Sequence, residues 1–111
     1  MTAEEIEAIA FALPAVTKVV QWGDSNVYKV GGKVFAMCHP SGALSFKVSE
    51  IGFLVLTENG PGRQAPYTAK GQWVAVDIGA VDPEDVRGWL ATAHSLIAAK
   101  LTRKARAELG L

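Results

Sequence analysis

The sequence predicts an α+β fold in which helices from both ends of the chain cover an antiparallel β-sheet. Apolar residues recur at helical spacing near both ends, whereas the central segments alternate apolar and polar residues as strands do. Two adjacent glycines, Gly31 and Gly32, separate two central segments and are typical of a tight hairpin turn. Short turns join antiparallel strands, so a doubly wound α/β fold is excluded. We expect one domain over residues 1–111.

A helix is predicted at the start of the chain. Thr2 and Glu5 have the spacing of a capping box, and Pro14 ends the helix. The residues between them place one apolar stripe on the helix, formed by Ile6, Ile9, Ala10 and Leu13.

Four strands are predicted next, over residues 17–22, 26–30, 33–38 and 43–48. A two-residue turn at Gly31-Gly32 places Tyr28 opposite Phe35 across the hairpin. In the fourth strand Leu44, Phe46 and Val48 share one face, which predicts a sheet with one dry side and one wet side.

The second half of the chain alternates helices with a loop and a strand. Ser49 is predicted to begin a short helix that runs to about Glu58. Residues 59–72 show no periodicity and predict a long loop, a kind of segment that often carries function. A strand is predicted over residues 73–78.

Two helices are predicted to complete the chain. Asp82 followed by Pro83 is a helix start, and Thr102 caps a last short helix that Gly110 closes. His94 is expected on the polar face of the longer helix. The buried stripe of this longer helix is predicted to comprise Val86, Trp89, Leu90, Ala93 and Ile97.

The composition is that of a globular protein, half hydrophobic and one-fifth charged. Cys38 is the single cysteine, so no intramolecular disulfide forms, which fits a reducing compartment. The N-terminus is acidic where a signal peptide is basic, and no apolar run reaches the ~20 residues that span a bilayer. We expect a cytoplasmic monomer with no membrane partner.

No residue set resembles a catalytic site. Cys38 and His39 are neighbours in an extended segment, so their side chains point to opposite faces. Together with His94 they lack the spacing of a zinc site, and the Gly31-Gly32 pair does not open a helix as a phosphate loop does. We expect no enzyme activity, no metal and no cofactor.

Basic residues are the remaining candidates for function. The formal net charge is zero, which argues against a strong nucleic-acid role, but a neutral total can hide one positive face. A β-ribbon with lysines at its tip has a shape that fits a DNA groove; the alternative is ordinary solubilising charge. The predicted phosphate contacts are Lys29, Lys33, Lys47, Arg63, Lys70, Lys100, Arg103 and Lys104.

The aromatic residues have a structural and a functional interpretation. Trp22, Trp73 and Trp89 each lie in an apolar segment, so they are expected in the core rather than on a base-stacking platform. Tyr67 lies in the predicted loop and is left open between the two.

Four segments, in this order, resemble the MmcQ/YjbR family: LPAVTKVVQWGDSNVYKVGGKVFAM, LSFKVS, PGRQAPYTAKGQWVAVD and SLIAAKLTRKAR. The resemblance runs from about Ile6 to Ala107. It implies a CyaY-like or secretion-chaperone-like fold and a small DNA-binding protein that uses basic β-hairpin wings. The positions that match the family pattern are Trp22, Lys47, Pro66, Tyr67, Trp73 and Lys100.

The resemblance implies two wings. The first is the hairpin around Gly31-Gly32 with Lys29 and Lys33, and the second is the 59–72 segment with Arg63 and Lys70. The expected partner is therefore double-stranded DNA.

Two other functions stay open. One is a protein-interaction or adaptor module without catalytic activity, favoured by the likeness to secretion chaperones and by the loop around Pro66 and Tyr67. The other is a small-molecule binder, which requires a pocket with convergent polar groups. Its predicted boundary is Trp22, Lys47, Tyr67 and Lys100.

Overall fold

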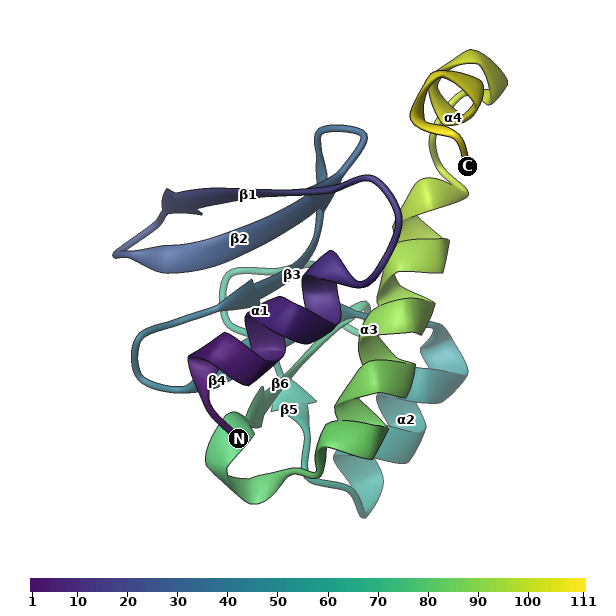
Figure 1. Ribbon diagram of the computed structural model, residues 1–111. Coiled ribbons are helices and arrows are strands. Elements are labelled where there is room, and N and C mark those ends of the chain that lie inside the picture. The colour runs from purple at the N-terminus through teal and green to yellow at the C-terminus, as the bar shows by residue number, and fades with distance from the viewer.

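A six-stranded antiparallel sheet forms the centre of the computed structural model, which describes residues 1–111 (Figure 1). The strand order is β1-β2-β3-β4-β6-β5. The strands are β1 (Val16–Gln21), β2 (Ser25–Val30), β3 (Lys33–Cys38), β4 (Ala43–Lys47), β5 (Arg63–Gln64) and β6 (Trp73–Asp77). The helices are α1 (Ala3–Phe11), α2 (Glu50–Glu58), α3 (Pro83–Ala98), α4 (Arg103–Leu109) and a 3-10 turn, η1 (Ile78–Ala80). The predicted α+β class and antiparallel sheet are confirmed.

One face of the sheet is covered by α1 and α3, and α2 packs against β5 and β6 (Figure 1). Leu44 and Phe46 of β4 are fully buried on this face, and Val48 lies in the same core cluster. The Phe46 ring stacks on Trp89 of α3 with centroids 5.5 Å apart. The predicted dry side is therefore the side that faces the helices.

The predicted helix signals are confirmed. Thr2 and Glu5 form a complete capping box at α1. The Asp82 side chain accepts a hydrogen bond from the backbone of Glu84 at the start of α3. Thr102 caps α4, which ends at Gly110 in a left-handed conformation.

The β2–β3 hairpin differs from the predicted register. Gly31 and Gly32 have φ values of 59° and 77°, as a type I′ turn requires. A β-bulge between the Lys29 and Tyr28 pairs then shifts the pairing, so Tyr28 lies opposite Ala36 instead of Phe35. The bulge adds one residue to β3, and both Phe35 and Ala36 are fully buried in the core.

His94 is buried, so its predicted place on a solvated helix face is wrong. A ring nitrogen of His94 lies 2.8 Å from the carbonyl oxygen of Pro14, and the ring meets Phe35 edge-on. The chain between α1 and β1 supplies the polar partner that allows the imidazole to be buried.

The strand directions define two ends of the molecule. The β2–β3 turn, the end of β4 and the start of β6 share one end, here called the tip end. The end of α3 joins them, because a Cβ on Gly31 would lie 2.6 Å from Leu101. The β1–β2 and β3–β4 turns and the end of β6 lie at the opposite end, here called the turn end. The N-terminus of Met1 also lies there, because it donates a hydrogen bond to Ile78.

Candidate nucleic-acid interface

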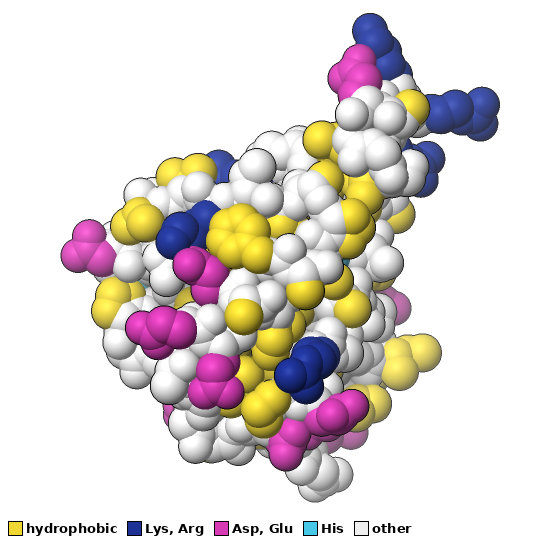
Figure 2. Space-filling view, viewed as in Figure 1, with side chains coloured by type: hydrophobic (Ala, Val, Ile, Leu, Met, Phe, Trp, Pro, Cys, Tyr) yellow, Lys and Arg dark blue, Asp and Glu magenta, His cyan; other side chains and the backbone are white.

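The antiparallel strands separate the charges of this neutral chain. Basic side chains gather at the tip end around α4, and acidic side chains gather toward the opposite part of the face in Figure 2. The tip end holds Lys29, Lys33, Lys47, Lys70, Lys100, Arg103, Lys104 and Arg106. The turn end holds Glu4, Glu5, Asp24, Glu58, Asp77, Asp82, Glu84 and Asp85.

A hollow of about 300 Å³ lies at the tip end between the end of β4, the start of α2 and the end of α3, with Lys47 and Lys100 in its lining. Lys47 is buried, and its Nζ donates a 2.8 Å hydrogen bond to Gln72. Burial lowers the pKa of Lys47, and repulsion from Lys100 lowers it further. The hollow therefore contains two like charges, and neither lysine forms an ion pair with an acidic side chain.

The N-terminus of α2 borders the same hollow. Ser49 caps this helix by accepting a hydrogen bond from the backbone of Gly52, and both Ser49 and Glu50 line the hollow. A helix N-terminus carries partial positive charge and favours anions. Glu50 is the one acidic residue in this lining, and Glu108 of α4 is a second acidic residue at the tip end.

The flanks of the hollow carry the other predicted basic residues. Lys33 is exposed beside the hairpin tip, and Lys29 is half-buried. Arg103 and Lys104 are exposed on α4, which has no buried residue. The contact between Gly31 and Leu101 holds the hairpin tip beside this helix.

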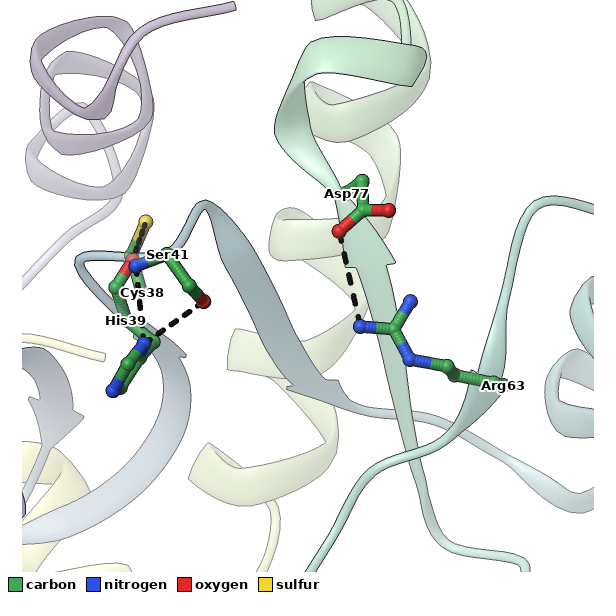
Figure 3. A network of polar contacts seen from close by, with 5 residues as sticks. All are labelled: Cys38, His39, Ser41, Arg63 and Asp77. Atoms are coloured by element: carbon green, nitrogen blue, oxygen red, sulfur yellow. Dashed lines mark hydrogen bonds and ion pairs between the residues drawn. The ribbon is translucent and has the colours of Figure 1, made fainter.

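Arg63 is the predicted residue that lies apart from this group. It belongs to β5, a strand inside the segment that the sequence predicts as a loop. Its guanidinium faces Asp77 of β6 at 3.8 Å (Figure 3). The predicted second wing is thus an edge strand followed by a loop, and a two-residue strand is too short to produce a periodic pattern.

A second hollow, of about 760 Å³, lies on the open face of the sheet and contains Arg63 in its lining. Trp22 and Tyr67 also line it, as the predicted pocket requires, but Lys47 and Lys100 line the first hollow instead. The expectation that Trp22 belongs to the core is wrong, because its side chain is 58% exposed. Ser25, Met37 and His39 also line this hollow, and no sequence pattern predicts their place there.

The adjacent Cys38 and His39 do not form a nucleophile–base pair (Figure 3). Cys38 is buried on the helix side, and its Sγ contacts the backbone oxygen of His39 at 3.9 Å. Burial raises the pKa of the Cys38 thiol, which keeps it protonated. The His39 ring lies on the other side, where its Nδ1 lies 2.8 Å from the Ser41 hydroxyl.

Comparison with protein families assigns the chain to a family. The model of the YjbR family matches residues 11–96. The chain belongs to the YjbR family. No helix of this YjbR-family protein is both long and apolar enough to cross a membrane.

Solved structures share the fold of this YjbR-family protein. A Deinococcus radiodurans protein with a DUF419 domain is 24% identical, with a TM-score of 0.89 over 99% of this chain and 88% of that one. A Pseudomonas syringae protein is 13% identical, with a TM-score of 0.74 over 86% of this chain and 98% of that one. At these identities the likeness is one of fold. No curated protein matches the sequence.

Proposed function

We propose that this protein binds double-stranded DNA through its tip end and acts by binding, without catalysis. The observation that carries the proposal is the separation of charge, which gathers most of the 11 basic residues at one end of a neutral chain. Phosphate contacts from lysine and arginine dominate the affinity of proteins for DNA. A neutral total charge does not oppose such binding when the positive residues share one surface.

The hollow between Lys47 and Lys100 supports a phosphate contact. A phosphate there would relieve the repulsion between the two lysines and face the N-terminus of α2. Because Lys47 is already held by Gln72, little side-chain freedom is lost on binding. This site therefore fixes one phosphate, while the exposed lysines and arginines around it contact its neighbours.

The acidic turn end supports a defined orientation on DNA. Acidic side chains such as Asp24 and Asp82 are repelled by phosphate, whereas the tip end is attracted to it. The proposed contacts are made to phosphates, which position a protein on the duplex but do not read its sequence. We therefore propose binding with weak base preference.

A matched pair of charge reversals tests the proposal. Arg103 is an exposed arginine in the first turn of α4, and Arg87 is an exposed arginine in the second turn of α3, at the acidic turn end. In fluorescence anisotropy with a labelled duplex, Arg103→Glu is expected to weaken binding and to reduce the magnitude of the log–log salt slope by about 1. Arg87→Glu is expected to bind as the wild type does.

The control separates a local contact from a change in net charge, since both variants change the charge equally. Equal weakening of both variants would show that total charge, and not the tip end, governs binding. Unchanged affinity of the Arg103→Glu variant would likewise contradict the proposed interface.

A second candidate function is a protein-interaction module, favoured by an apolar stripe on α2. Ile51, Leu54 and Val55 are 75%, 52% and 66% exposed and lie at helical spacing on one surface. We expect the uncharged Ile51→Gln/Val55→Gln double variant to lose a protein that the wild type captures, with DNA affinity unchanged. Capture of the same proteins by both would contradict this function.

A further inference from the structure

The hollow on the open face of the sheet has no role in the proposed DNA contact. Its floor is formed by sheet residues that point away from the helices, among them Met37 of β3 and Ser45 of β4. Its walls come from the β1–β2 turn, the β3–β4 turn and the chain that follows β5. A volume of about 760 Å³ falls in the range of sites for small organic ligands.

Two aromatic side chains at the rim of this hollow contribute little to the core. Trp22 is 58% exposed and Tyr67 is fully exposed, although large aromatic residues usually bury most of their surface. They come from segments far apart in the sequence, and the fold brings both to the same hollow. Their ring faces are therefore available to stack on a flat ligand.

Two side chains of the hollow, Arg63 and His39, can donate hydrogen bonds to an anion. The Arg63 guanidinium meets Asp77 at 3.8 Å in an exposed ion pair, and such pairs are weak. Nδ1 of His39 accepts a 3.0 Å hydrogen bond from the backbone of Ser41, so the ring carries its proton on Nε2. No aspartate or glutamate lines the hollow.

We propose that this hollow binds a small flat aromatic anion. The ring stacks against Trp22 and Tyr67, and a carboxylate or phosphate on the ligand accepts hydrogen bonds from Arg63. Nε2 of His39 is a second donor elsewhere in the same lining. The chemistry shared by both kinds of ligand is a planar ring that bears one anionic group. None of these four residues belongs to the hollow between Lys47 and Lys100, so this proposal stands apart from DNA binding.

Isothermal titration calorimetry with four probes tests the ligand chemistry. Indoleacetate and adenosine monophosphate carry a ring and an anion, indoleacetamide lacks the charge, and hexanoate lacks the ring. We expect at least one of the two aromatic anions to bind, and the uncharged and ringless probes to bind about tenfold more weakly or not at all. The tighter of the two anions distinguishes a carboxylate ligand from a phosphate ligand.

Variants place the binding in this hollow. Tyr67→Gly keeps the backbone conformation because φ is 60° at this position, and Arg63→Gln removes the charge at an exposed site. Each is expected to weaken binding about tenfold, as the loss of one stacking or charged contact does. Arg87→Gln is the control, because it removes an exposed arginine outside the hollow and should leave affinity unchanged.

The proposal is overturned if neither aromatic anion produces heat of binding at millimolar concentration. It is also overturned if indoleacetamide or hexanoate binds as tightly as the aromatic anions, or if Tyr67→Gly and Arg63→Gln bind as the wild type does. The Arg103→Glu variant provides a separate comparison, since it is expected to lose DNA affinity and to keep affinity for the anion.

Discussion

One carboxylate, that of Glu7, links the first helix to the sheet. Glu7 accepts a 2.8 Å hydrogen bond from Lys18 of β1 and a 3.1 Å hydrogen bond from the Tyr28 hydroxyl of β2. The hydrogen bond from Lys18 is the main cause that lowers the pKa of Glu7. Burial of Tyr28 and the negative charge of Glu7 raise the pKa of the phenol, so the hydroxyl remains a donor.

The Glu7 contacts predict a pH-dependent stability. Because the folded-state pKa of Glu7 is lowered, its contribution is present above the unfolded pKa and is lost as pH falls through the folded pKa. We expect the free energy of unfolding to fall between about pH 5 and pH 3, and to fall less in the Glu7→Gln variant. Urea unfolding at several pH values measures both curves. Parallel curves would show that Glu7 does not contribute.

Trp22 is exposed, against the prediction, because of its backbone conformation. Its place after a β-branched segment predicts a buried strand residue. In the structure Trp22, Gly23 and Asp24 all have positive φ, so the turn begins one residue earlier than Gly23 indicates. A left-handed conformation costs a non-glycine residue roughly 1–2 kcal/mol. The local sequence therefore does not predict this conformation at a tryptophan. The same conformation at Tyr67 turns a second aromatic side chain toward solvent.

The hairpin tip packs against the chain that directly follows α3, and each stabilises the position of the other. Leu101 is buried directly after α3 and lies against Gly31, where no side chain fits. Gly32 has the same left-handed backbone, and nothing lies within 4 Å of a Cβ placed there. A side chain at Gly32 would therefore cause backbone strain alone, whereas a side chain at Gly31 would also collide with Leu101.

Alanine substitutions at the two glycines test this contact. Gly32→Ala is expected to cost about 1 kcal/mol of unfolding free energy from backbone strain. Gly31→Ala is expected to cost about 1 kcal/mol or more beyond that, because Leu101 must move. Urea denaturation measures both losses, and equal losses would show that the tip is not held against Leu101.

Elements with strong local signals were predictable, and elements set by pairing were not. The capping residues of α1, α3 and α4 and the glycines of the β2–β3 turn act within a few residues of chain, so their positions can be inferred from the sequence. The bulge beyond Lys29 and the short strand at Arg63 depend on a partner strand. The local sequence of either segment does not predict which strand it pairs with or in which register.

The basic tip end forms only when the whole chain is folded. Lys33, Lys47 and Lys70 are far apart in the sequence and reach one end because the neighbouring strands β3, β4 and β6 alternate in direction. The basic stretch after residue 100 is visible in the sequence, but its neighbourhood to the hairpin tip depends on α3 crossing the sheet. The neutral total therefore underestimates how positive the tip end is.

The salt dependence of duplex binding distinguishes a phosphate-binding tip end from ordinary surface charge. With wild-type protein and a labelled duplex, we expect saturable anisotropy changes whose log–log salt slope is near −5, as about six phosphate contacts produce. If the magnitude of this slope is smaller in the Arg103→Glu variant, the tip end is the phosphate-binding surface. No binding at about 50 mM salt, or a slope near zero, would contradict the account.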